Sequence, residues 1–257
     1  MDYPVKRDRL QAWLQNRYMC VLEIKLATKN SYKLDIENKV ILLYLNGQIK
    51  NTKEKGSDIM NKQNSTITKL AQTAVLAALC YVAFTFLQIK IPVGDNATSL
   101  HIGNAVCVLG ALLIGGFYGG LAGAIGMTIG DLLDPVYIYS APKTFVLKLC
   151  IGLITGLVAH HIAKINEHTE KTYVAKWSTI AAIAGLGFNV IADPIVGYFY
   201  KRYLLGQPQE LASALLKISR ITTLVNAVVS VILVSILYNA VRPALIHTQL
   251  LNISPKK

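Results

Sequence analysis

The part of the chain that follows Met60 contains long stretches without a charged side chain. Leu70–Ile89 and Ile221–Val241 have no Asp, Glu, Lys or Arg, and the 35 residues of Asn96–Gly130 have none either. A helix needs about 20 mainly apolar residues to cross the roughly 30 Å of hydrocarbon in a bilayer. The chain is therefore predicted to be an integral membrane protein that crosses the bilayer several times.

Two further apolar stretches carry one charged residue each. Thr144–Ala163 contains Lys148, and Trp177–Tyr200 contains Asp193, which is followed by a proline that we expect to interrupt this helix. Asn96–Gly130 is too long for one span, and its central glycines favour a division into two helices. These glycines are Gly115, Gly116, Gly119 and Gly120.

These stretches predict an all-α integral membrane protein built as a bundle of six transmembrane helices. The first helix is Leu70–Ile89, and the last has Ile221–Val241 as its core, with room to begin near Glu210. The predicted division of the chain is a poorly structured N-terminal extension, residues 1–59, and a six-helix membrane domain, residues 60–257.

The N-terminal extension differs in composition from the rest of the chain. Residues 1–59 hold 11 of the 26 Lys and Arg residues and 7 of the 14 Asp and Glu residues, and no apolar run there is long enough to span a bilayer. Lys55-Gly56 can be encoded by a purine-rich sequence that resembles a bacterial ribosome-binding site, three codons before Met60. One hypothesis is that translation starts at Met60, and the alternative is a genuine cytoplasmic extension.

The distribution of Lys and Arg predicts the orientation, because cytoplasmic loops carry an excess of these residues. One set of helix ends carries eight of them and the other carries four. The eight are Lys62, Lys69, Lys164, Lys171, Lys176, Arg242, Lys256 and Lys257, and the four are Lys90, Lys143, Lys201 and Arg202. Both termini are therefore predicted to be cytoplasmic. The net charge of +12 is assigned to these helix ends rather than to nucleic-acid binding, since no basic face with interleaved aromatics is present.

Motifs for energy-coupled or hydrolytic chemistry are absent from the sequence. It contains no Gly-x-x-x-x-Gly-Lys-Ser/Thr, His-Glu-x-x-His, Gly-x-Ser-x-Gly or Gly-x-Gly-x-x-Gly. The cysteines are widely spaced and predict neither a disulfide framework nor a metal site. We therefore expect no enzyme activity, cofactor or metal, and energy for uphill transport would come from a partner or an ion gradient.

Ionisable and amide side chains interrupt the apolar stretches, where each is costly unless it faces a cavity or a partner. In the predicted topology they lie in the outward halves of their helices, and polar and aromatic residues of the outward loops join them. The charged candidates are Asp131, Lys143, Lys148, Asp193, Lys217 and Arg220, the amides are Asn96, Asn104, Asn189 and Asn226, and the others are His101, Tyr137 and Tyr139. They predict one outward pocket for a small planar solute. The alternative is interfacial snorkelling and buried ion pairs, such as Asp131 with Lys148.

Small residues recur one turn apart on two predicted helices. Ala74 and Ala78 lie on one face of the first helix, which indicates a docking surface for another helix or, alternatively, packing inside the bundle. The ladders Gly115/Gly119/Gly123 and Ala122/Gly126/Gly130 are interpreted as internal packing.

Three segments resemble the S components of energy-coupling factor (ECF) vitamin transporters. Thr98-Ser-Leu-His-Ile-Gly-Asn104 resembles their T-x-L-H-L-G-D-A segment. Gly126-x-x-x-Gly130-Asp131-Leu-Leu and Tyr139-Ser-Ala-Pro142-Lys-Thr-Phe-Val-Leu-Lys148, followed by Gly152 and Gly156, resemble two later segments of that family. The match runs in order from about Leu70 to Ala163, and more loosely to Val241.

The resemblance implies a six-helix subunit of a bacterial plasma membrane that captures a vitamin outside the cell. It implies docking through Ala74 and Ala78 onto a transmembrane scaffold, with two cytoplasmic ATPases supplying energy. Asn104 stands where the family pattern often has Asp, and the Leu-Lys-x-Asp-Phe-Ser-Asp signature of a riboflavin-specific group is absent. Hydroxymethylpyrimidine or a vitamin B6 form is therefore expected before riboflavin. The alternative function is a stand-alone, ion-coupled secondary transporter that uses Asp131 and Asp193.

Overall fold

The computed structural model describes residues 12–13, 15–16, 44, 66–94 and 96–248. The chain divides into two units, Met1–Gln63 and Asn64–Lys257, and the described residues of the first unit are helical. The expected boundary at Met60 lies outside the described residues. The division into residues 1–59 and 60–257 therefore stays a prediction, as does the translation start at Met60.

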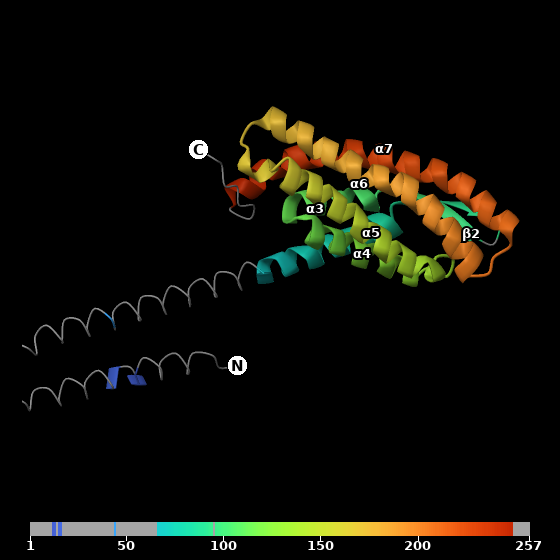
Figure 1. Cartoon of the computed structure of the whole chain (residues 1–257), viewed down its shortest axis with the longest axis horizontal. Coiled ribbons are helices and arrows are strands. Elements are labelled where there is room, and N and C mark those ends of the chain that lie inside the picture. The colour runs from blue at the N-terminus through green and yellow to red at the C-terminus, as the bar shows by residue number, and fades with distance from the viewer. Residues whose placement is uncertain (1–11, 14, 17–43, 45–65, 95, 249–257) are drawn as a thin grey trace, which may run out of the picture. The chain divides into compact units, whose positions relative to one another are not determined.

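Helices make up most of the second unit (Figure 1). Its α-helices are Thr66–Thr85, α3 (Gly103–Ile114), α4 (Gly116–Leu132), α5 (Ala141–Gly156), α6 (Lys171–Phe199) and α7 (Gln209–His247). Short 3-10 turns, η1 (Ile138–Ser140) and η3 (Ile165–Glu167), and π-helical turns, η2 (Leu157–Ile162) and η4 (Tyr200–Leu204), extend or connect them.

Four helical segments of the described residues are long and apolar enough to cross a membrane. They are Thr66–Thr85, Ile138–Ile162, Lys171–Leu204 and Gln209–His247. The prediction of a mainly α-helical membrane protein with several spans is confirmed. The count of six spans and the cytoplasmic position of both termini stay predictions.

Helix boundaries follow the expected breaks at some positions and not at others. The first helix was expected over Leu70–Ile89, but it covers Thr66–Thr85, and Gln88 and Ile89 belong to a strand. The long apolar stretch divides at Gly115, whose φ of 96° is accessible to glycine and strained for other residues, so the predicted split is confirmed. The last helix begins at Gln209, near the expected Glu210. The predicted interruption at Asp193-Pro194 is wrong, because α6 continues through Pro194. Neighbouring helices and small local adjustments make a proline tolerable within a membrane helix.

A two-stranded hairpin precedes α3, where the sequence predicted helix from Asn96 onward. Strands β1 (Gln88–Val93) and β2 (Asn96–His101) pair antiparallel, from Gln88 opposite His101 to Val93 opposite Asn96. The chain reverses after Val93 at Gly94, which has a φ of 57°. The all-α prediction is corrected at this point, and β2 packs against α7.

Glycines let the central helices approach backbone to backbone. A Cβ at Gly152 of α5 would overlap the backbone of Gly120 of α4, and a Cβ at Gly119 would overlap the backbone of α3 at Ala111. A Cβ at Gly126 would overlap the carbonyl group of Ala77 in the helix Thr66–Thr85. Close approach through small residues is how helices associate where lipid supplies no hydrophobic drive. The interpretation of the two predicted ladders as internal packing is confirmed for Gly119, Gly123, Gly126 and Gly130, but not for Gly115, where a Cβ would meet nothing within 4 Å.

We expect the Gly152→Ala variant to be less stable than the wild type by about 1–3 kcal/mol, because the new methyl group must push α4 and α5 apart. Thermal unfolding in detergent, followed by tryptophan fluorescence, measures this loss. Gly187→Ala on α6 is the matched control, since a Cβ there meets nothing within 4 Å. Equal unfolding temperatures for the two variants would contradict the role assigned to the contact between α4 and α5.

Candidate solute-binding site

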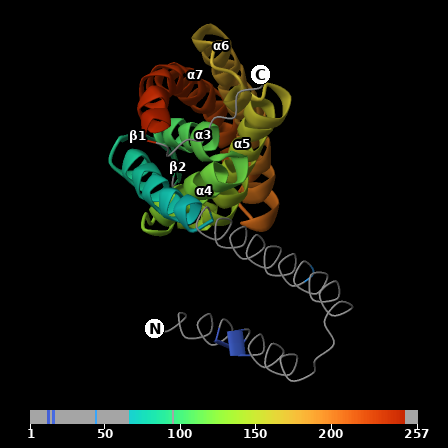
Figure 2. The same ribbon diagram turned by 90° about the vertical axis from the view of Figure 1, so that its left-hand side faces the viewer.

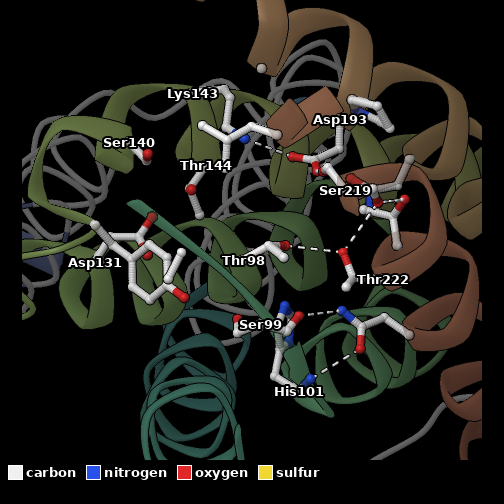
Figure 3. A pocket seen from close by; sticks show the side chains of 18 of the residues that line it. Thr98, Ser99, His101, Asp131, Ser140, Lys143, Thr144, Asp193, Ser219 and Thr222 are labelled. Carbon is white, nitrogen blue, oxygen red and sulfur yellow. Dashed lines mark hydrogen bonds and ion pairs between the residues drawn. The ribbon is translucent and has the colours of Figure 1, made fainter. Parts of the chain in front are cut away.

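A polar pocket lies at one end of the bundle, between the hairpin and the surrounding helices. It has a volume of about 100 Å³ and is lined by residues of β2, of the helix Thr66–Thr85 and of α3 to α7 (Figure 3). The residues come from the last turns of α4, the first turns of α5, the C-terminal half of α6 and the N-terminal half of α7. Because neighbouring helices of this bundle run in opposite directions, these segments meet at one end.

Nine of the thirteen candidate side chains line this pocket: His101, Asn104, Asp131, Tyr137, Lys143, Lys148, Asn189, Asp193 and Asn226. Tyr139 does not line it and is 70% exposed, and the side chain of Asn96 is not among those that the structure describes. Lys217 and Arg220 of α7 are also outside its lining.

Helical spacing explains which residues of each helix face the pocket. Thr144 and Lys148 are four residues apart on α5, and Asn189 and Asp193 have the same spacing on α6. Side chains that are three or four residues apart share one face of a helix. Both α5 and α6 therefore direct one row of polar side chains toward the pocket, and their apolar side chains face away from it.

The carboxylate of Asp193 is held by two partners. Lys143 forms an ion pair with it, with 2.8 Å between Nζ and Oδ1, and the hydroxyl group of Ser219 donates to Oδ2 at 3.1 Å (Figure 3). The ion pair that was considered between Asp131 and Lys148 does not form, and Lys148 has no ion-pair partner among the described residues. The pocket therefore keeps one carboxylate, Asp131, and two ammonium groups, Lys148 and Lys201, without an ion-pair partner among the described residues.

Several buried acceptor atoms that line the pocket have no hydrogen-bond partner among the described residues. They are Oδ2 of Asp131, Oδ1 of Asn104, Oδ1 of Asn189 and Nδ1 of His101. A buried polar atom without a partner costs about 1–3 kcal/mol. A solute with N–H or O–H groups would remove that cost, so the pocket is suited to a polar solute rather than to an apolar one.

Aromatic side chains complete the pocket wall. The rings of Phe84 and His101 pack edge to face, with their centroids 4.8 Å apart. Tyr137 is 8% exposed, and burial raises the pKa of its phenol group to about 12, so it faces the pocket uncharged at neutral pH. These rings supply apolar surface against which a planar solute can pack.

Asn226 connects α7 to the hairpin through both ends of its amide group. Its Oδ1 accepts a hydrogen bond from the backbone N–H of His101 at 3.0 Å, and its Nδ2 donates to the carbonyl oxygen of Ser99 at 2.9 Å. One turn away, the hydroxyl groups of Thr98 and Thr222 lie 3.0 Å apart (Figure 3). Asn226 was predicted as a solute contact, but its hydrogen-bonding groups are used to hold β2 as a wall of the pocket.

The opposite edge of the hairpin is tied to the connection between α4 and α5. Lys90 of β1 forms an ion pair with Asp134, and its ammonium group lies 5.6 Å from the ring centroid of Tyr137. This contact is more exposed than the Asn226 contacts, since the side chain of Lys90 is 43% exposed. The hairpin is therefore held by buried neutral hydrogen bonds on α7 and by a surface charge pair on the other side.

Sequence reasoning missed the small hydroxyl residues of the pocket. They are Thr98, Ser99, Ser140, Thr144, Ser219, Thr222 and Thr223, and Tyr198 and Lys201 were not assigned to the site either. Serine and threonine are common in apolar helices and carry no distinct signal. Only the spacing of Ser219 and Thr222 with the predicted Asn226 along one face of α7 could have indicated two of these positions.

We expect Asn226→Ala to loosen the hairpin, because the N–H of His101 and the carbonyl group of Ser99 both lose their partner. Hydrogen–deuterium exchange over Gln88–His101 should become faster by about tenfold or more, the ratio that corresponds to about 1.4 kcal/mol. Asn239→Ala is the control, because Asn239 lies on the same helix and bonds only to the Ser235 carbonyl oxygen. Unchanged exchange in Asn226→Ala would show that β2 is held by other contacts.

Comparison with known proteins gives one match. The model of a family described as ECF-type riboflavin transporter, S component, matches residues 64–243, which include every residue of the pocket. Searches of curated proteins and of solved structures returned no match. The matched segment covers more than half of the chain, and its described part is the helical unit that holds the pocket. The chain therefore belongs to the S components of ECF transporters, the substrate-binding subunits of vitamin uptake systems rather than enzymes.

Proposed function

We propose that this S component captures a small ring-containing vitamin, or a precursor of one, outside a bacterial cell and presents it for ATP-driven uptake. The observation that carries the proposal is the set of buried polar atoms without a hydrogen-bond partner among the described residues that line one pocket. These atoms are placed where only a bound molecule or water can supply the missing donors, which is the property expected of a polar recognition site.

The charge pattern of the helix ends supports an outward position for the pocket. The pocket residues come from the ends that carry Lys90, Lys143 and Lys201, whereas the opposite ends carry the larger number of Lys and Arg residues. Cytoplasmic ends are the ones enriched in these residues. The proposed topology has six membrane helices and cytoplasmic termini, with α3 and α4 as spans shorter than the usual length of about 20 residues.

The size of the pocket bears on the identity of the solute. Pockets for drug-sized ligands usually measure about 300–1,000 Å³, and this one encloses about 100 Å³. A single ring fits that space better than a tricyclic one, so hydroxymethylpyrimidine or a vitamin B6 form is proposed before riboflavin. Riboflavin stays the next candidate because the matching family is described by it.

The proposed docking surface for the scaffold subunit is the outer face of the helix Thr66–Thr85, which lies at the edge of the bundle (Figure 2). Ala74 and Ala78 are exposed on this face, next to the exposed side chains of Val75, Leu79 and Val82. The buried residues Thr73, Ala77 and Cys80 lie on the opposite face, toward the bundle. The small residues are therefore free for an external helix and are not used inside the subunit.

Substitution of the pocket acceptors should weaken binding of the solute. We expect about a two- to tenfold loss of affinity for Asn189→Ala, and about ten- to a hundredfold for Asp131→Ala, since charged hydrogen bonds contribute more than neutral ones. Calorimetry in detergent with the three candidate vitamins measures this, with Asn239→Ala outside the pocket as control. Wild-type affinity in both variants would contradict the assignment of this pocket.

Substitution of the docking alanines should separate binding from transport. Ala74→Trp and Ala78→Trp are expected to bind the solute normally and to lose uptake, because a bulky ring obstructs the approach of the scaffold helix. Ala240→Trp on the exposed face of α7 is the matched control. Recovery of the scaffold and both ATPases at wild-type yield by the two variants would contradict the docking surface, and uptake without any ATPase would favour the ion-coupled alternative.

A further inference from the structure

Lysines outnumber carboxylates on one side of the pocket. Lys143, Lys148 and Lys201 line it together with Asp193 and interact electrostatically with that carboxylate or with one another. Asp193 already accepts the Lys143 ion pair and the Ser219 hydrogen bond. Lys148 and Lys201 form no ion pair with any residue that the structure describes.

The other carboxylate of the pocket offsets this charge only in part. Asp131 lies across the pocket from Asp193 in Figure 3 and forms no ion pair with Lys148, although it interacts electrostatically with Lys143 and Lys148. The pocket as a whole therefore has three lysines and two carboxylates among the described residues, a formal surplus of one positive charge.

Burial makes this surplus costly. Lys148 is 7% exposed and sits in the middle of α5, so its ammonium group cannot extend to bulk water as a surface lysine does. An unpaired charge in a membrane protein interior normally faces a partner of opposite sign. Since no described carboxylate forms an ion pair with Lys148 or Lys201, an acidic group of a bound solute can supply this partner.

We propose that the captured solute carries an acidic group, a carboxylate or a phosphate monoester, that binds between Lys148 and Lys201. This inference rests on the proposed function and narrows its substrate class. The ring of the solute then points its N–H or O–H donors toward Oδ2 of Asp131, at the other end of the pocket. A solute with an acidic group at one end and donors at the other matches the charge pattern, whereas a neutral solute leaves the lysines unpaired.

Matched pairs of compounds test the proposal on the full chain in detergent. Calorimetry compares pyridoxal with pyridoxal 5′-phosphate, riboflavin with its 5′-phosphate, and pyridoxine with 4-pyridoxic acid, so phosphate and carboxylate are tested separately. In at least one pair the acidic member should bind about tenfold tighter or more, the effect expected of a charged hydrogen bond. The preference should shrink as salt concentration rises.

Two variants show whether the lysines cause the preference. Lys201→Gln and Lys148→Gln should weaken binding of the acidic compound by at least about fivefold more than they weaken binding of its neutral partner, a difference of about 1 kcal/mol. Lys176→Gln, on the far end of α6 and outside the pocket, is the control. Lys201 lies in the terminal turn η4, so its variant keeps the test valid if Lys148→Gln does not fold.

The outcomes separate the two claims. If only neutral compounds bind, or if Lys201→Gln weakens both members of a pair equally, the acidic-group inference is overturned and the proposed capture of a vitamin stands. If no compound of any pair binds to folded protein but hydroxymethylpyrimidine does, the acidic-group inference is again overturned and the proposed capture stands. If hydroxymethylpyrimidine does not bind either, both are contradicted.

Discussion

The arrangement of this protein depends on the cost of leaving a polar group in hydrocarbon. An ionised side chain at the centre of a lipid-facing helix costs about 2.5–3.5 kcal/mol or more. In this fold Asp131, Lys148 and Asp193 avoid the lipid because they line a pocket at one end of the bundle. The amide groups of Asn104 and Asn189 line the same pocket. The same constraint that excludes these groups from lipid concentrates them in a single pocket.

Close packing of the glycine-rich helices brings these polar residues together. Gly116 and Gly120 of α4 meet Gly152 and Gly156 of α5 at backbone distance, which holds these two helices firmly together. Asp131 lies near the C-terminal end of α4, and Lys148 lies one turn before Gly152 on α5. The close contact between the two helices therefore fixes the positions of these two charged residues.

The hairpin adds the wall that the helices lack. Its β2 strand is anchored on α7 by the amide of Asn226 and by Thr222, while β1 reaches the connection between α4 and α5 through Lys90. Membrane-embedded structure outside a helix is tolerated where it is buried in protein or lines a cavity. Because the backbone of Ser99 and His101 bonds to Asn226, part of the hairpin satisfies this condition.

The sequence alone predicted the helices and most of the charged and amide residues of the pocket, because an isolated Asp131 or Asn189 in an apolar stretch has few physical explanations. The serine and threonine residues were not predicted, because a hydroxyl group in a helix can donate its hydrogen bond to a backbone carbonyl group one turn earlier. Thr223, for example, donates to the Ser219 carbonyl oxygen at 2.6 Å in its own helix. The hairpin was missed because strand pairing is a contact between segments, and residues 96–101 have no charge that distinguishes them from an apolar helix. Tyr139 was predicted to contact the solute but does not line the pocket. It lies on a turn, where the direction of a side chain depends on tertiary packing and does not follow from the spacing of residues along the chain.

Native mass spectrometry of the protein purified from its own cells tests directly whether this pocket holds a small polar solute. We expect one solute of vitamin size bound per chain, and we expect it to be lost when Asn104 and Asn189 are both replaced by alanine. If the wild-type protein carries no such solute even after incubation with the candidate vitamins, or if a solute stays bound in the double variant, this pocket is not the binding site.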